Sequence, residues 1–461
     1  MSSPSRGEGS LIIAPWGAPA SWRNVRYKLE LEGGGAGRGE GGELEFCTTL
    51  PLLLRAYEGA DVALVVLDSL VDEFRGQEQQ SACYRCYDQL RSLVREAGRA
   101  SSYSELREGV ECFVEAYLGC LLQHASGVSP ENVRAVVCPA VGRPGGSWSF
   151  EGRAADFEAV ALYELGRLCA EQPYHRLILD LTHGINFMPA LTLRLAERLA
   201  GVLLAAHAEL AEQGVELLVY NSDPVTGSAP LRLNLVAKAR IKSIPIPHEL
   251  PGDLLKPREK VAEGGVQGVN KRYREAVKLT LSALVYPMPL VLCLSRGKAA
   301  NSFAVLEDAY RLWLNSIVVD GQSVRRRLSL SPDGVYALLL SGSAAKRLEK
   351  LGLGYPAELA KLKELAELYR AVNESYYHLV MNELGRVEEL LRETTAETKM
   401  LYELYGEQPR GKRFDKRVMI AHAGLQKEFV EVLEGRELKY TIEGSKLEEE
   451  LKDSGLLITM Q

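Results

Sequence analysis

The stretch Asp180-Leu-Thr-His-Gly-Ile-Asn-Phe-Met-Pro189 follows the apolar run Leu177-Ile-Leu179 and precedes residues 190–199, which have helical periodicity. An apolar run, a polar turn with glycine and an amphipathic segment predict a strand, a turn and a helix start. In an open α/β sheet this junction lies at the carboxyl edge of the strands, where ligands bind. Backbone N–H groups and the helix dipole favour anions there, so we expect a site for a phosphate-bearing ligand.

The same alternation of strand-like and helix-like segments extends to about residue 245. Candidate strands lie at residues 10–15, 61–67, 133–139, 174–180 and 215–220, with amphipathic stretches at 83–97, 104–124 and 157–171. This order predicts an α/β, Rossmann-like domain with a mostly parallel sheet. Residues 231–237 and 242–247 are candidates for a hairpin or an edge strand.

A proline-rich segment, residues 243–252, separates this domain from a second half of different character. Helical periodicity occurs at residues 271–285, 302–319, 356–393 and 416–434, and short hairpins or extensions are expected at 329–341 and 439–460. We therefore predict an α/β domain over residues 1–245, a linker and helical connector over 246–300, and a mainly α-helical domain over 301–461.

Composition and charge limit the possible classes of protein. A chain of 461 residues is too long for one ordinary hydrophobic core and suggests two or three domains. Its content of 46% hydrophobic and 25% charged residues is typical of a soluble globular protein. The apolar runs are too short to cross a bilayer and the first ten residues are no signal peptide, so we expect a cytoplasmic protein without a membrane partner. A net charge of −6 argues against a general nucleic-acid coat but permits a local basic groove.

The eight cysteines and seven histidines give little support for a metal site. Only Cys83 and Cys86 are closely spaced, and no second pair stands at zinc-ribbon distance. We favour cysteines as small core residues over a redox or metal role, and consider a disulfide framework improbable in the cytosol. No histidine pair has the H-x₃-H spacing of a catalytic metal site, so we predict no metal.

Polar or turn-forming residues follow three of the predicted strands. Because the ends of parallel strands share one rim, these residues would together offer an aromatic face, hydrogen-bonding groups and close backbone approach, which suits a nucleotide. Helix capping is the alternative for any single one of them. The candidate ligand-binding residues are Trp16, Gly17, Thr182, His183, Gly184, Asn186, Asn221 and Ser222.

A second candidate site is Arg417-Val-Met-Ile-Ala-His422, near the end of the chain. Histidine exchanges a proton near neutral pH, and arginine carries a planar charge that fits phosphate. R-x₄-H alone is a weak pattern, but a basic run that supplies phosphate-binding charge precedes it. The candidate RNA-binding residues of this run are Arg410, Lys412, Arg413 and Lys416.

Together these residues resemble CRISPR-associated CARF–HEPN ribonucleases, the accessory nucleases of type III CRISPR systems. Asp180–Pro189, with Trp16 and residues 220–224, is similar to their CARF sensor domain, and Arg417–His422 matches the R-x₄-H signature of their HEPN domain. The domain order agrees along the chain. Val418 departs from the pattern, because many HEPN sites carry a polar residue after the arginine.

The resemblance implies that cyclic oligoadenylate, commonly cyclic tetra-adenylate, binds across a sensor homodimer and activates cleavage of single-stranded RNA in antiviral defence. Each protomer would contribute one R-x₄-H to a composite site. The resemblance places Trp16, Thr182, His183, Gly184 and Asn186 at the activator. The sequence does not decide whether the protein forms an assembly larger than a dimer or slowly degrades its activator.

The residues suggest a mechanism without a catalytic cofactor. The substrate's 2′-hydroxyl attacks the adjacent phosphate, Arg417 stabilises the charge on phosphoryl oxygens and His422 moves or positions a proton. This endoribonuclease reaction gives a 2′,3′-cyclic phosphate and a 5′-hydroxyl. The alternative is a nucleotide-sensing transcriptional regulator that binds nucleic acid without cutting it.

Overall fold

The computed structural model describes residues 9–29, 41–72, 81–125, 129–224, 229–247, 249–259, 265–392, 398–409, 413–434, 436–442 and 444–461. Its largest element is an eight-stranded sheet, mostly parallel, as predicted. The order is β3 (Gly41–Phe46), β2 (Val25–Leu29), β9 (Leu231–Ile241), β8 (Val215–Ser222), β7 (Arg176–Asp180), β1 (Ser10–Trp16), β4 (Asp61–Leu67) and β5 (Val133–Cys138). The α/β, Rossmann-like fold class is therefore confirmed.

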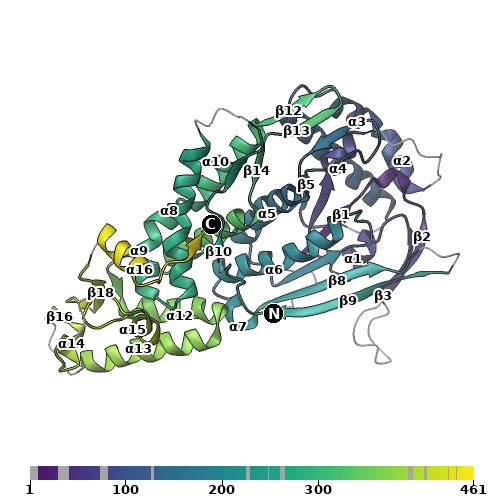
Figure 1. The fold of residues 1–461 in the computed structure, drawn as a ribbon. Coiled ribbons are helices and arrows are strands. Elements are labelled where there is room, and N and C mark those ends of the chain that lie inside the picture. Colours follow the sequence, from purple (N-terminus) through teal and green to yellow (C-terminus); the bar gives the residue numbers. More distant parts are fainter. Residues whose placement is uncertain are drawn as a thin grey trace.

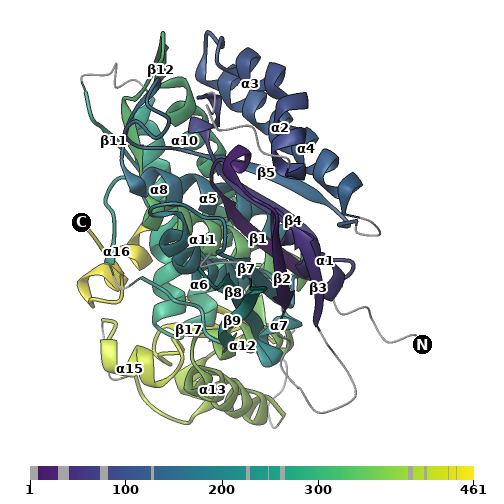
Figure 2. The same ribbon diagram turned by 90° about the vertical axis from the view of Figure 1, so that its right-hand side faces the viewer.

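The strand order reverses beside β1. After β1 the chain forms β2 and β3 at the far end of the sheet, then β4 and β5 on one side of β1, and it returns to β7 and β8 on the other side. Right-handed crossovers place the helices of these two halves on opposite faces of the sheet. Figure 2 shows α2 (Ala82–Gln89), α3 (Arg91–Ala97) and α4 (Tyr103–His124) on one side of the sheet, with α5 (Ala154–Glu171) and α6 (Met188–Ala206) on the other. The switch point beside β1 is where such sheets bind ligands.

The middle of the chain packs onto the second face. Helix α11 (Pro332–Lys350) contacts both α5 and α6, and it forms a bundle with α8 (Val266–Val285), α9 (Pro289–Ala299) and α10 (Ser302–Asn315). Strands β12 (Ile317–Asp320) and β13 (Ser323–Arg326) pair with each other, and β13 also pairs with β6 (Ser149–Glu151) of the α/β domain. Two further two-stranded sheets join segments that are distant in sequence. One pairs β10 (Glu249–Leu250) with β19 (Thr459–Met460), and the other pairs β11 (Leu255–Pro257) with β14 (Leu328–Leu330).

The carboxyl-terminal part is largely helical, as predicted. Figure 1 places it at the end of the molecule opposite β2 and β3. It comprises α12 (Leu359–Val372), α13 (Glu374–Arg392), α14 (Leu401–Leu404), α15 (Lys416–Ala421), α16 (Ser445–Asp453) and a small sheet of β15 (Ala357–Glu358), β18 (Glu437–Tyr440), β17 (Val430–Val432) and β16 (Lys399–Met400).

Four predicted helices are shorter than expected. The segment 302–319 is helical only to Asn315, because its last residues form β12, and the segment 83–97 is divided between α2 and α3 at Leu90. The segment 356–393 is two helices, because Asn373 is extended and its side chain accepts a hydrogen bond from Ser375 N, which starts α13. Lys363 Nζ lies 2.5 Å from Glu388, so α12 and α13 run antiparallel. The segment 416–434 is helical only to Ala421, because Ala423 and Gly424 have positive φ angles.

Three other predictions of local structure were wrong. Residues 439–460, expected as short hairpins or extensions, contain the helix α16 between β18 and β19. Residues 242–247 form no strand. Residues 329–341 are not a hairpin, because β14 ends at Leu330 and α11 starts at Pro332. Ser331 caps that helix by accepting a hydrogen bond from Gly334 N, and proline at the first helical position fits a helix start. Among the described residues, no helix is both long and apolar enough to cross a bilayer.

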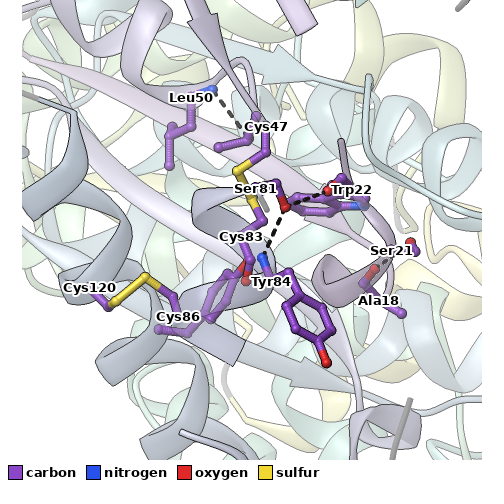
Figure 3. The surroundings of a disulfide bond; sticks show 12 residues. Ala18, Ser21, Trp22, Cys47, Leu50, Ser81, Cys83, Tyr84, Cys86 and Cys120 are labelled. Atoms are coloured by element: carbon purple, nitrogen blue, oxygen red, sulfur yellow. Dashed lines mark hydrogen bonds between the residues drawn. A yellow bond between two sulfur atoms is a disulfide. The ribbon is translucent and has the colours of Figure 1, made fainter. Parts of the chain in front are cut away.

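The expectation that the cysteines are unpaired core residues was wrong for four of them. Figure 3 shows disulfides between Cys47 and Cys83 and between Cys86 and Cys120. The three-residue spacing of Cys83 and Cys86 directs both toward neighbouring elements from one region of α2. Their partners come from the segment before α1 (Leu50–Ala56) and from α4, so the pairing depends on tertiary structure.

Candidate functional site

The first strand and the β7 turn are joined at the carboxyl edge of the large sheet. Strand β1 ends at Trp16, and Gly17 N donates a hydrogen bond of 2.9 Å to the carbonyl oxygen of His183. A Cβ atom on Gly17 would lie 2.6 Å from Ile185 Cγ2. Glycine is therefore required for this close approach of the two turns.

A cavity of about 420 Å³ opens beside this junction. It is lined by residues from the turns after β1, β4 and β7 and from the segment after β5, principally Trp16, Gly17, Leu67, Ser69, Leu70, Asp72, Gly145, Ser147 and Ile185. Asp72 Oδ2 accepts hydrogen bonds from Ser147 N (3.0 Å) and Trp148 N (3.2 Å), which fixes the segment after β5 against the turn after β4. The cavity has the size and the mixed polar and apolar lining of a small-ligand site.

Aromatic rings surround His183 on the other side of the junction. The Trp22 ring lies 4.2 Å from the His183 ring between centroids, and the Tyr27 ring lies edge-on at 6.5 Å. Burial lowers the pKa of His183 to about 3, so its imidazole is neutral at physiological pH. Its Nε2 atom, like Nε1 of Trp16, is buried without a hydrogen-bond partner among the described residues. These are two buried ring nitrogens at the junction that the described residues leave without a partner.

The remaining predicted ligand residues have different surroundings. Thr182 Oγ1 accepts a hydrogen bond from Ser222 N (3.2 Å), which joins the β7 and β8 turns. Gly184 packs against Pro189, where a Cβ atom would lie 2.8 Å from Pro189 Cγ. Asn186 and Asn221 are exposed, and neither lines the cavity. The structure thus places Trp16 and Gly17 on the cavity wall, His183 in an aromatic cluster beside it, and Thr182 and Ser222 in a supporting contact.

Asp180, the last residue of β7, fixes the turn that follows this strand. Its carboxylate accepts hydrogen bonds from Thr182 N (3.2 Å) and from Thr49 Oγ1 (2.5 Å), and it is buried. Burial raises the pKa of Asp180. We assign it a structural role, because both oxygens are used within the protein.

The R-x₄-H segment spans one short helix. Asp415 caps α15 by accepting hydrogen bonds from Arg417 N (2.8 Å) and Val418 N (3.1 Å), and His422 is the residue that ends it. The chain then turns sharply at Gly424, where a Cβ atom would lie 3.0 Å from Met288 Cβ. The connector turn at Met288 thus abuts the segment that carries His422.

A buried carboxylate from α13 orients His422. Glu383 Oε2 lies 3.0 Å from His422 Nδ1, and Glu383 Oε1 accepts a hydrogen bond of 2.9 Å from Arg386. The Glu383 side chain is 8% exposed, whereas that of His422 is 46% exposed. A fixed carboxylate on Nδ1 selects the tautomer and leaves Nε2 for chemistry, as in other histidine sites of enzymes.

A cavity of about 700 Å³ surrounds His422. Its wall combines apolar side chains with charged ones of both signs, principally Glu383, Arg386, Leu401, Tyr405, Arg413, Phe414, Val418, His422, Gln426 and Lys427. Arg417 is exposed and does not line this cavity, and its guanidinium has no partner among the described residues. The two residues of the motif therefore do not share one cavity within a single chain.

The basic run divides into residues with different environments. Arg413 lines the His422 cavity. Lys416 instead donates a hydrogen bond to Gly455 O (2.8 Å), and its Nζ lies 4.9 Å from the Tyr286 ring centroid. The predicted RNA-binding residues Arg410 and Lys412 lie outside the described residues.

Sequence reasoning missed Glu383 and the cavity residues that follow β4 and β5. Glu383 is 39 positions from His422 and belongs to a helix with many charged residues, so no local pattern distinguishes it. Ser69, Asp72 and Ser147 follow predicted strands. Extending the search for polar strand ends to all five predicted strands could have found them.

Comparisons with known proteins give one family. The family model described as CRISPR system endoribonuclease Csx1, CARF domain, matches residues 11–224. The model described as CRISPR system endoribonuclease Csx1, HEPN domain, matches residues 373–443, which include Glu383, Arg417 and His422. A relative from Methanocaldococcus jannaschii, described as CRISPR system endoribonuclease Csx1, is 26% identical over 329 residues. The match covers 67% of this chain and 58% of the relative, which is less than two thirds of that protein's length.

Proposed function

Because the chain belongs to the Csx1 family of CRISPR system endoribonucleases, with a CARF and a HEPN domain, we propose that it cuts single-stranded RNA when its sensor binds cyclic oligoadenylate. The observation that carries this proposal is His422, which Glu383 holds inside a large cavity of the HEPN region. A histidine with a fixed Nδ1 and a free Nε2 suits proton transfer to or from a ribose hydroxyl.

The chemistry follows from the groups at this site. The RNA 2′-hydroxyl attacks the adjacent phosphate, and His422 Nε2 accepts or returns the proton. Arg417 stabilises the negative charge that builds on the phosphoryl oxygens. The products are a 2′,3′-cyclic phosphate and a 5′-hydroxyl, and no step requires a metal ion. Only single strands have the backbone freedom for in-line attack, so duplex RNA is spared.

The position of Arg417 supports a composite site. It lies outside the cavity of its own chain and is free among the described residues to face another copy. In a homodimer, each chain would contribute its R-x₄-H segment to a shared site, and a two-fold sensor would match a two-fold ligand. Assembly beyond the dimer is compatible with this arrangement.

The sensor has features that suit adenine nucleotides. A neutral His183 against Trp22 offers a stacking face and a hydrogen-bonding nitrogen, and the cavity beside Gly17 provides room. Cyclic tetra-adenylate is the ring that we propose. The further ligand contacts that we propose are Thr182, Gly184, Asn186, Asn221 and Ser222, which lie on the same edge and are reached by a ligand that extends past the cavity.

Cleavage of labelled RNA in chelator-treated buffer tests the proposal. Full-length protein should cut single-stranded RNA after addition of cyclic tetra-adenylate, and cyclic tri- and hexa-adenylate test ring size. His422→Ala and Arg417→Ala should lower the rate by about a hundredfold or more. His378→Ala, at an exposed histidine of α13, is the matched control and should keep the wild-type rate. Activity of His422→Ala equal to wild type would overturn the catalytic assignment, and RNA binding without cleavage would favour a regulator.

A further inference from the structure

Three metal-ligating side chains meet where α2 packs against α4. One ligand atom each from Cys86, Cys120 and His124 lies within 4.8 Å of the others, and no other group of three histidine, cysteine or acidic ligands this close occurs among the described residues. Cys120 and His124 are four residues apart on α4, so both project from one face of that helix toward Cys86 of α2.

The chemistry of this group is that of a thiophilic cation site. Two thiolates and one imidazole are the ligands that divalent zinc prefers, and a water molecule completes a tetrahedron. Gln89 Oε1 lies 3.6 Å from Cys120 Sγ and adds a polar atom at the edge of the group. No carboxylate belongs to the group, which disfavours calcium or magnesium.

Solvent reaches this group through two of its three members but does not reach the neighbouring disulfide. His124 is exposed and Cys120 is half-buried, whereas Cys86 is completely buried, as are Cys47 and Cys83 of the other disulfide. A dithiol or phosphine reductant therefore meets the Cys86–Cys120 bond first. Cys112, an exposed free cysteine on α4, provides an internal comparison.

We propose that Cys86, Cys120 and His124 bind a divalent cation of the zinc class when the Cys86–Cys120 disulfide is reduced. Reduction breaks the sulfur–sulfur bond, and the reductant supplies two electrons. With a dithiol, two protons also move to the cysteines and the dithiol becomes a disulfide. The cation then displaces the two thiol protons and binds both sulfurs and the imidazole. Helix α2 is thereby joined to α4 in both redox states.

The connection matters because α2 supports the aromatic wall of the sensor. Ser81 caps α2 by accepting a hydrogen bond from Tyr84 N (3.1 Å), and it donates one to Trp22 O (3.0 Å), as Figure 3 shows. Trp22 in turn lies against His183. A cation between α2 and α4 would keep this wall in place in a reducing environment.

Cobalt titration of the full-length chain tests the proposal without RNA or cyclic nucleotide. Protein reduced with a phosphine under argon should bind about one equivalent of Co²⁺ with thiolate-to-cobalt charge-transfer absorption, and Zn²⁺ should displace it. Cys112→Ser should behave as wild type. Cys120→Ser and His124→Ala should each bind at least tenfold more weakly, and His124→Ala should keep a weaker sulfur band.

Two results would overturn the site. One is reduced wild type that binds no more Co²⁺ than the oxidised protein, and the other is Cys120→Ser that binds as tightly as wild type. A urea unfolding curve for each variant shows whether it is folded, and Cys120 and His124 are partly exposed positions where folding should survive. Because the assay uses no substrate, its failure leaves the proposed nuclease function unaffected.

Discussion

Nδ1 of His422 lies 3.0 Å from Oε2 of Glu383, although one residue ends α15 and the other lies within α13. The carboxylate is buried and also accepts a hydrogen bond from Arg386, so its position is fixed from two sides. Its effect on His422 is to fix the ring orientation and to favour a proton on Nδ1. Nε2 is then the nitrogen left without a proton, and we propose that it is the reactive one.

We expect Glu383→Gln to lower the rate of RNA cleavage by about ten- to a hundredfold, with the loss in kcat and little change in KM. An amide at this position can hydrogen-bond Nδ1 through its oxygen or its nitrogen, so the tautomer is no longer fixed, and it stabilises an imidazolium less. Single-turnover cleavage with activator present measures the effect.

Glu389→Gln is the matched control, because Glu389 is exposed on the same helix. It should cleave at the wild-type rate. A Glu383→Gln protein as fast as wild type, with an unchanged pH profile, would show that the contact with His422 plays no part in catalysis.

Substitution of Arg413 should weaken RNA binding, whereas substitution of Lys416 should lower the stability of the protein. Arg413→Ala, measured in the His422→Ala background, should weaken RNA binding several-fold and reduce the salt slope of binding by about 0.7, because one phosphate contact is lost. Lys416→Ala should leave RNA affinity within about twofold. Fluorescence-anisotropy titrations at several salt concentrations separate the two variants.

Lys416→Ala should instead destabilise the protein by about 1 kcal/mol, because it removes the hydrogen bond to Gly455 O and the contact with the Tyr286 ring. Unfolding in urea measures this change. An equal loss of RNA affinity in both variants would contradict this division of the basic run.

The α/β fold was predictable because its signals are local. Each strand of the parallel core is a short apolar run, and the turn after β7 carries its glycine and polar residues within a few positions. Strands β2 and β3, at one end of the sheet, carry no such run, since residues such as Arg26, Lys28 and Glu45 interrupt them. The strand ends at Trp16 and His183 could likewise be placed on one edge, because parallel strands share a direction.

The proposed nuclease site was only partly predictable, because its decisive contacts are tertiary. Arg417 and His422 form a local pattern, but Glu383 approaches from α13 and Met288 from the connector. The break at Asn373 also escaped prediction, since both flanking segments have strong helical periodicity. The disulfides depend on the packing of α2 against elements far away in sequence.

Gly17→Ala should reduce activation by cyclic oligoadenylate without changing the HEPN site. The added methyl group would lie 2.6 Å from Ile185 Cγ2 and must displace the β7 turn or fill the cavity. We expect the activator concentration for half-maximal cleavage to rise by about tenfold or more, with the maximal rate retained.

Ile185→Ala supplies the rescue test, because it removes the atoms that the methyl group would meet. Ile185 is partly exposed, so its truncation should be tolerated. The Gly17→Ala, Ile185→Ala double variant should regain most of the lost sensitivity. If Gly17→Ala and wild type need the same activator concentration for half-maximal cleavage, the turn at Gly17 takes no part in binding the activator.

His183 should make the folded protein less stable as the pH falls below about 6.5. Its pKa is lowered to about 3 in the folded protein, whereas an unfolded chain has the ordinary value near 6.5. Above pH 6.5 both states are neutral at this residue and it contributes no pH dependence. Between these two pKa values only the unfolded chain binds the proton, so the free energy of unfolding falls by up to about 1.4 kcal/mol per pH unit.

Urea unfolding at pH 7 and pH 5, followed by tryptophan fluorescence because Trp22 lies against His183, isolates this contribution. Wild type should lose about 2 kcal/mol more than His183→Gln over this interval, since glutamine has no proton to bind. His175→Gln, at an exposed histidine, should keep the wild-type dependence. If wild type and His183→Gln lose the same stability, the folded protein takes up this proton over the interval as the unfolded chain does. The imidazole would then be charged at pH 5, and its burial would not keep it a neutral hydrogen-bonding group for the ligand.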